Sequence, residues 1–272
     1  MTAKDTVVVP ISDMHSGGST ALFPNYMMQF ENANVTPKDE QKEMFAHWTA
    51  YAEEIAKVRK GKRLLIVHDG DATEGWHHNT SQVVTMLENE QIRIHIELMD
   101  HFLKIVKFGK GDDLYYVKGT EVHTNGSENV IGEDLGATPC GEFYAWEELK
   151  LEENGIRLWF THHGPTAGDG ANFGNSFRNW LKNKIFYECV NNGIPIPHYV
   201  ITGHTHKPCW TDYVGRHERK YHRLQGLICP SWQKRTRFGH RSAPLQLGDV
   251  GLQYFVISKD GLIIDPVERL MK

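Results

Sequence analysis

The chain has 272 residues, of which 40% are hydrophobic and 24% charged, and its formal net charge is −4. These proportions are those of globular proteins and exclude a disordered chain. Its four cysteines form no C-x-x-C pair, which disfavours both a disulfide framework and a thiolate zinc site. No apolar run approaches the ~18 residues of a membrane span, and the N-terminus lacks a signal-peptide pattern. We therefore expect a cytoplasmic protein with no membrane contact.

Predicted strands and helices alternate along most of the chain. Short apolar runs predict five buried strands, at residues 6–12, 63–68, 114–117, 156–161 and 199–202. Between them, apolar residues at steps of three and four predict helices. Thr36 and Asp39 form a capping box for the first helix, and Thr80 or Ser81 can cap the second. A third helix follows a Gly-rich loop and ends at Asn191-Asn192-Gly193.

After the fifth strand the pattern changes to shorter strands separated by turns. These strands are predicted at residues 221–229, 252–258 and 262–265. No linker or internal repeat divides the chain. We therefore predict one α/β domain over residues 1–272, with helices packed on sheets that contain mixed strands.

Residue types that bind metals follow each of the five buried strands. Because the carboxyl ends of sheet strands meet at one crevice, we expect these side chains to converge. One such motif would mean little, since a single His after a strand is usually structural. Five such motifs in chain order strongly disfavour an interpretation in which all of these residues are purely structural. The motifs are Asp13-Met14-His15, Gly70-Asp71, Gly119-Thr120-Glu121-Val122-His123, His162-His163-Gly164 and Gly203-His204-Thr205-His206.

The chemistry of these side chains points to a transition metal. Carboxylate and imidazole ligands suit Mn, Fe, Zn or Ni. A carboxylate can also bridge two ions that lie ~3.5–4 Å apart, the arrangement of a two-metal hydrolytic site.

This set of motifs resembles that of the calcineurin-like metallophosphoesterase superfamily, whose pattern is D-x-H, G-D, G-N-H-[DE], a later His and G-H-x-H. The motifs run from Asp13 to His206, about three quarters of the chain. The resemblance implies a four-layer α/β/β/α sandwich with two mixed sheets. It also implies two divalent metal ions, with manganese as the first expectation and iron, zinc or nickel as alternatives.

The resemblance further implies a role for each matching residue. Asp71 would bridge the two ions. His162 is preferred to His163 as a ligand, because it lies next to the strand end and H-x-G spacing is similar to that of the superfamily's DNA-repair nucleases. His163 would then face the substrate. The first ion would be held by Asp13, His15 and His206, and the second by His162 and His204.

The third motif departs from the family pattern. It has no Asn and one extra residue of spacing, and in this it resembles phage-type members of the superfamily. Glu121 is the best available oxygen ligand for the second ion, with Thr120 the weaker candidate. His123 is the candidate catalytic histidine.

Polar residues that follow Asp71 could contact the substrate. Glu74 could orient a ligand or a water molecule. His77, His78 and Asn79 could bind substrate phosphate, although an ordinary loop that caps the next helix is an equally open interpretation.

Residues 207–241 form a basic segment, with nine Lys or Arg residues against two acidic ones and hence a net charge of +7. Aromatic residues are interleaved with the basic ones, a mixture that suits nucleic acid. Because the segment begins directly after the last metal motif, we expect it to border the crevice, with Arg235 and Arg237 as substrate contacts. A solvated basic loop and a subunit interface are the alternatives.

These features together predict a metal-dependent phosphoesterase that hydrolyses esters of nucleic acid or nucleotides, as a phosphodiesterase or nuclease does. Two cations would neutralise phosphate charge and activate a bridging hydroxide that attacks phosphorus. His123 would protonate the leaving group. The alternatives are a phosphatase of proteins or small molecules and a non-catalytic binding module of the same fold.

Overall fold

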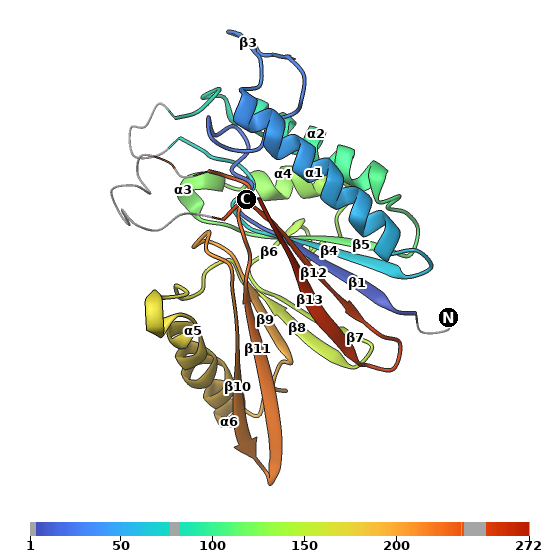
Figure 1. The fold of residues 1–272 in the computed structure, drawn as a ribbon, viewed down its shortest axis with the longest axis vertical. Coiled ribbons are helices and arrows are strands. Elements are labelled where there is room, and N and C mark those ends of the chain that lie inside the picture. Colours follow the sequence, from blue (N-terminus) through green and yellow to red (C-terminus); the bar gives the residue numbers. More distant parts are fainter. Residues whose placement is uncertain (1–3, 77–81, 235, 237–248, 272) are drawn as a thin grey trace.

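Two β-sheets dominate the computed structural model, which describes residues 4–76, 82–234, 236 and 249–271 (Figure 1). The first sheet has the strand order β13-β12-β1-β4-β5-β6. Its strands are Ile263–Leu270, Gly251–Ile257, Thr6–Ile11, Arg63–Asp69, Asp113–Val117 and Ala145–Trp146. The second sheet has the order β10-β11-β9-β8-β7. Its strands are Cys209–His217, Lys220–Ile228, Tyr199–Thr202, Ile156–Phe160 and Leu149–Glu153. A small hairpin pairs β2 (Met28–Gln29) with β3 (Asn34–Val35).

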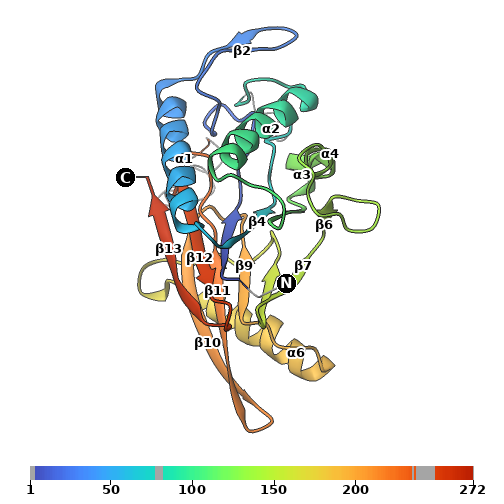
Figure 2. The ribbon, with the colours of Figure 1, turned by 90° about the vertical axis from the view of Figure 1, so that its right-hand side faces the viewer.

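Helices cover the outer faces of both sheets (Figure 1 and Figure 2). On the six-stranded sheet lie α1 (Asp39–Val58), α2 (Glu88–Ile105) and α4 (Ser127–Asp134), and the short α3 (Glu121–Thr124) precedes α4. On the five-stranded sheet lie α5 (Asn175–Trp180), the π-helix η2 (Leu181–Phe186) and α6 (Tyr187–Asn192), after the short 3-10 helix η1 (Gly170–Asn172). No helix of the described ranges combines the length and apolar character that crossing a membrane requires.

Alternating side chains explain how the layers pack. Successive residues of a strand point to opposite faces of its sheet. Thus Val7 and Val9 of β1 join the apolar cluster under α1 and α2, whereas Val8 joins the cluster between the two sheets. Tyr199 of β9 stacks on Phe255 of β12 across that interface, with ring centroids 4.9 Å apart. A third cluster fills the space between the second sheet and the helices from α5 to α6.

Both sheets contain parallel and antiparallel strands, so the predicted α/β class with mixed strands is confirmed. In the first sheet, β1, β4 and β5 are parallel neighbours, while β12 pairs with β1 in the antiparallel sense. In the second sheet, β8 and β9 are parallel neighbours. Parallel neighbours end at the same edge, so the loops after these five strands leave their sheets on one side.

The helix starts differ from the sequence prediction. The first helix begins at Asp39 rather than near Thr36, because the Gln41 side chain accepts a hydrogen bond from the Lys38 backbone N–H at 3.1 Å. This hydrogen bond between the N-cap backbone and the side chain of the third helical residue takes the place of the capping box that the sequence predicted for Thr36 and Asp39. The second helix begins at Glu88, while its predicted caps, Thr80 and Ser81, lie outside the described residues.

Candidate metal centre

Backbone hydrogen bonds tie together the loops that follow the central strands. The Asp13 N–H donates to the Gly70 carbonyl at 3.1 Å, and the His15 N–H donates to the Asp71 carbonyl at 2.9 Å. These bonds hold the loops after β1 and β4 side by side. The His204 N–H, which follows β9 in the other sheet, donates to the Asp13 carboxylate at 2.9 Å. The two sheets therefore meet at this point.

One group of candidate ligands consists of Asp13, His15 and His206. The His206 Nε2 atom lies 3.1 Å from Asp13 Oδ1 and 3.1 Å from His15 Nε2. Asp13 and His15 are buried, and His206 is partly exposed. Ligand atoms of all three fall within 4.8 Å of one another, and one carboxylate with two imidazoles is a donor set for a transition metal. The sequence assigned these three residues to one ion.

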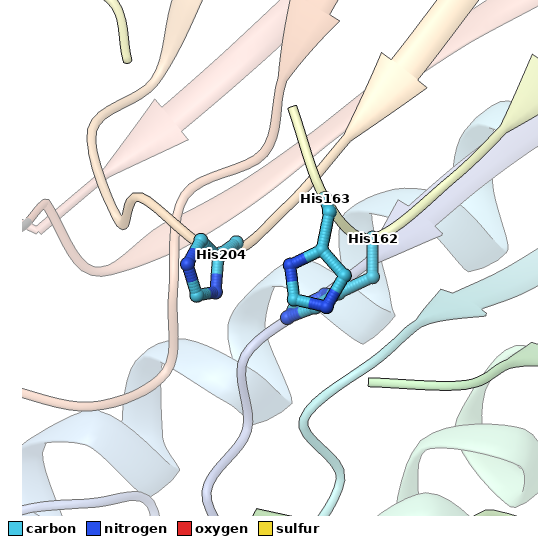
Figure 3. A group of neighbouring side chains, drawn as sticks. All are labelled: His162, His163 and His204. Atoms are coloured by element: carbon cyan, nitrogen blue, oxygen red, sulfur yellow. The ribbon is translucent and has the colours of Figure 1, made fainter. Parts of the chain in front are cut away.

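A second group consists of His162, His163 and His204 (Figure 3). The first two follow β8 and the third follows β9. Their rings meet edge-on, with centroids 5.0 Å apart for His162 and His163, and 4.8 Å apart for His163 and His204. The sequence predicted His162 and His204 as ligands and directed His163 to the substrate. The structure brings the His163 ring into the same group.

Asp71 lies between the two groups. Its Oδ2 atom is 3.1 Å from His162 Nε2 and 3.8 Å from His15 Nε2. The Thr120 backbone N–H donates to the other carboxylate oxygen at 2.6 Å. The Asp69 carbonyl accepts a hydrogen bond from His162 Nδ1 at 2.7 Å. That bond turns His162 Nε2 toward Asp71 and leaves this nitrogen to act as the ligand atom.

Imidazoles compensate for the charge of the buried carboxylates. Burial would raise the pKa of Asp13, but nearby His206 and the hydrogen bond to His15 outweigh it and hold that pKa well below its usual value. Burial would lower the pKa of His162, yet its bond to Asp71 and the charge of Asp13 raise it to about 10. Positive charge is therefore stabilised where the carboxylates of Asp13 and Asp71 converge.

The backbone of the candidate ligands adopts a conformation that non-glycine residues rarely take. Non-glycine residues with positive φ are uncommon and cluster at functional sites. A glycine is required beside them, because a Cβ at Gly203 would collide with the side-chain oxygen of Ser12. Five candidate ligands have φ in the left-handed region, namely Asp13 (+54°), His15 (+45°), Asp71 (+52°), His204 (+69°) and His206 (+55°).

The third motif does not contribute the residue that the sequence favoured. Glu121 is exposed at the start of α3 and belongs to none of the described groups that could hold a metal. The preceding residue is closer: Thr120 Oγ1 lies 3.4 Å from Asp71 Oδ2 and 3.4 Å from His204 Nδ1. Thr120 is the N-cap of α3 and Glu121 is the first residue of that helix, with its side chain exposed.

His123 lies beside the first group and is held by the loop after β4. Its Nδ1 atom is 2.8 Å from the Glu74 carbonyl, and its ring meets the His15 ring edge-on at 4.7 Å. Burial, followed by the charge of His15, lowers the pKa of His123 to about 4. The Glu74 carboxylate lies 3.2 Å from His15 Nδ1, so Glu74 orients a candidate ligand, as the sequence suggested.

The remaining sequence predictions concern the substrate contacts and the basic segment. His77, His78, Asn79, Arg235 and Arg237 lie outside the described residues. Much of the basic segment forms the hairpin of β10 and β11, in which β11 runs parallel to β9. The hairpin tip therefore projects from the end of the sheet opposite the candidate ligands (Figure 1). Strand pairing thus carries the middle of the segment away from the candidate ligands, while most of its last part, residues 235 and 237–241, lies outside the described residues.

A buried residue that supports the centre was not among the residues predicted from the sequence. His95 of α2 lies with Nδ1 3.0 Å from the Ala72 carbonyl and 3.2 Å from Ser16 Oγ, and with Nε2 3.0 Å from Tyr116 Oη. It thereby joins the loops after β1 and β4 to the neighbouring strand. A histidine among the apolar residues Ile94, Leu98 and Met99, which recur at helical spacing, was the signal that could have found it.

Glu121 gives a direct test of the third motif. Glu121→Gln removes a charge without changing the shape of the side chain. Because this side chain is exposed and outside the ligand groups, we expect unchanged manganese binding in a calorimetric titration. Thr120→Val, which removes a hydroxyl close to Asp71 and His204, is the matched comparison and should weaken binding. A marked loss of manganese affinity in Glu121→Gln would return Glu121 to the ligand set.

The comparisons with known proteins match this chain to no family, so the assignment of its function depends on the geometry and chemistry of the site. No protein-family model matches the sequence, and a search of the curated proteins finds no relative. Within the described residues, buried His and Asp side chains lie close enough together to hold a metal ion.

Proposed function

We propose that this protein is a metallophosphoesterase that uses two divalent cations to hydrolyse phosphate esters of nucleic acid or nucleotides. The position of Asp71 carries the proposal. Its carboxylate is within 4 Å of imidazoles from two ligand groups, at 3.1 Å from His162 and 3.8 Å from His15. A carboxylate between two such groups is what a bridging ligand requires.

The arrangement of the layers supports the same assignment. Helices lie outside each of two mixed sheets, and the candidate ligands follow parallel strands of both. This agrees with the four-layer α/β/β/α sandwich of the calcineurin-like superfamily, whose motifs the sequence resembles.

The donor atoms fit two cations of the manganese type. Asp13, His15 and His206 would hold one ion, His162 and His204 the other, and Asp71 both. Thr120 and His163 are the neighbours that could complete the second set. When bound, the cations would neutralise phosphate charge and lower the pKa of a coordinated water.

The chain itself would supply proton transfer and orientation. The Glu74 carbonyl accepts a hydrogen bond from Nδ1 of His123 at 2.8 Å. This leaves Nε2 as the ring nitrogen that would take up a proton and pass it to a leaving group, as the lowered pKa of this imidazole requires. Glu74 orients His15 through its carboxylate. One loop thus positions both a candidate ligand and the candidate acid.

A substrate panel tests the proposal. Purified protein stripped with EDTA and reloaded with manganese would be offered a chromogenic phosphomonoester, a chromogenic phosphodiester, single- and double-stranded DNA, and RNA. We expect hydrolysis that requires added metal and two bound manganese ions per chain. Hydrolysis of monoesters alone would favour a phosphatase. Metal binding without any hydrolysis would favour a non-catalytic binding module.

A further inference from the structure

A cavity of about 380 Å³ opens beside the second ligand group, on the outer face of the five-stranded sheet. Its walls come from β7, β8 and the helices from α5 to α6. His163 lines this cavity and is also a member of the group with His162 and His204. The cavity and the candidate metal centre are therefore contiguous through one side chain.

Two tryptophans give the cavity its chemical character. Trp159 stands on β8 and Trp180 ends α5, and both indole rings are partly exposed. Lys150 lies over the Trp159 ring, with its Nζ atom 4.4 Å from the ring centroid. Partly exposed indoles in a concave site of this size are typical of pockets for planar organic ligands.

The charged groups around the cavity balance one another. Lys150 and Lys184 are matched by Glu148 and Glu188 in the lining, and Lys150 pairs with Glu148 at 3.1 Å. A phosphate site would carry excess positive charge. The balanced rim instead suits a neutral ring with polar edges, which can stack on an indole and exchange hydrogen bonds with charged side chains.

One wall of the cavity is an irregular helix. The π-helix Leu181–Phe186 contributes Lys184 and Ile185 to the lining. Single turns of π-helix within α-helices are rare and occur frequently at functional sites. This second feature distinguishes the cavity from an ordinary gap between a helix and a sheet.

We propose that this cavity binds the nucleobase of the substrate while the attached phosphate lies at the metal centre. The inference rests on the proposed function and makes it more specific. Trp180 would contact a face of the base, and Trp159, whose ring Lys150 covers on one side, would border it. His163 would lie where the base-bearing part of the ligand joins its phosphate. The base could belong to a mononucleotide or to the end of a strand.

Two esters with the same leaving group test the proposal. Thymidine 5′-(p-nitrophenyl phosphate) carries a base, and methyl p-nitrophenyl phosphate does not. In Trp180→Leu we expect the ratio of kcat/KM for the first ester to that for the second to fall about tenfold or more. Tyr187→Leu removes an exposed aromatic ring of the next helix that is outside the cavity lining, and should keep the wild-type ratio. Equal losses for both esters in Trp180→Leu would overturn the proposal.

Photocrosslinking gives a readout that does not depend on turnover. Irradiation of the protein with 5-iodouridine 5′-monophosphate, followed by mass spectrometry, should label the peptides that contain Trp159 or Trp180. Excess thymidine 5′-monophosphate or a thymidine decamer should suppress the label, and the stronger competitor identifies the source of the base. Labelling confined to other peptides, or suppression by phosphotyrosine but not by nucleotide, would contradict base binding.

The two proposals fail in different ways. If wild-type protein hydrolyses neither ester with manganese, the phosphoesterase proposal fails. The crosslinking experiment then still tests whether the cavity binds a nucleobase. If both esters are hydrolysed and the ratio does not respond to Trp180→Leu, the phosphoesterase stands and the base site is wrong. Circular dichroism of each variant keeps a folding defect from being mistaken for either result.

Discussion

Asp71→Asn should cause the largest functional loss of any single substitution in the centre. Asparagine keeps the shape of the side chain and tolerates the left-handed backbone of this position, but it removes the charge between the two ligand groups. Substitutions that only support a ligand already lower metal affinity about 10–100-fold. We therefore expect more than about a 100-fold loss of manganese affinity, with one ion or none retained and hydrolysis nearly abolished.

Metal content and activity should be measured together on this variant. Elemental analysis after dialysis gives the number of ions per chain, and calorimetry gives the affinity. Asp260→Asn is a matched control, because Asp260 is exposed in the turn between β12 and β13. Two tightly bound ions and wild-type hydrolysis in Asp71→Asn would show that Asp71 does not bridge.

His123→Asn is expected to have the second largest effect, on turnover rather than on metal content. If His123 transfers a proton to the leaving group, its removal should lower kcat by about 10²–10⁴-fold. The loss should be smaller for nitrophenyl esters than for alkyl esters, since a good leaving group needs little protonation. Single-turnover rates for the two kinds of ester provide the measurement.

The competing role for His123 is that of a metal ligand. One of its ring nitrogens lies within 4.8 Å of a ligand atom of His15 and of Glu74. A fall in manganese content in His123→Asn, with equal losses for good and poor leaving groups, would identify it as a ligand. His47→Asn, on α1 and outside the ligand groups, controls for the general effect of removing a histidine.

The location of the centre was predictable because it depends on strand ends. Apolar runs identify strands, and parallel strands of a sheet end at the same edge. The residues just after β1, β4, β8 and β9 therefore had little freedom to lie elsewhere. The loops that carry Asp13 and Asp71 follow the parallel neighbours β1 and β4 and lie side by side for this reason, as the hydrogen bond from the His15 N–H to the Asp71 carbonyl at 2.9 Å shows.

Details that depend on local geometry could not be predicted. Glu121 and Thr120 are adjacent, and only the start of α3 decides which of them points toward Asp71. The basic segment was expected near the site because it begins directly after the last metal motif, but the antiparallel pairing of β10 with β11 places Arg216 and Lys220 at the far end of the sheet. The grouping of His163 with His204 depends on how two loops lie relative to each other. The spacing of residues within one segment of the chain does not determine this.

The left-handed residues of the centre also make this protein less stable than its fold permits. Each such non-glycine residue costs roughly 1–2 kcal/mol, and the cost is lower for Asp than for β-branched side chains. Five of them together approach the whole net stability of an ordinary domain, about 5–15 kcal/mol. Exchanging His206 for glycine would relieve the strain at that position, but it would also remove the imidazole that lies 3.1 Å from the buried Asp13 carboxylate. Breaking a buried pair of this kind costs about 3–5 kcal/mol, more than the strain at one residue, so the contacts between the candidate ligands themselves keep their backbone in the left-handed conformation.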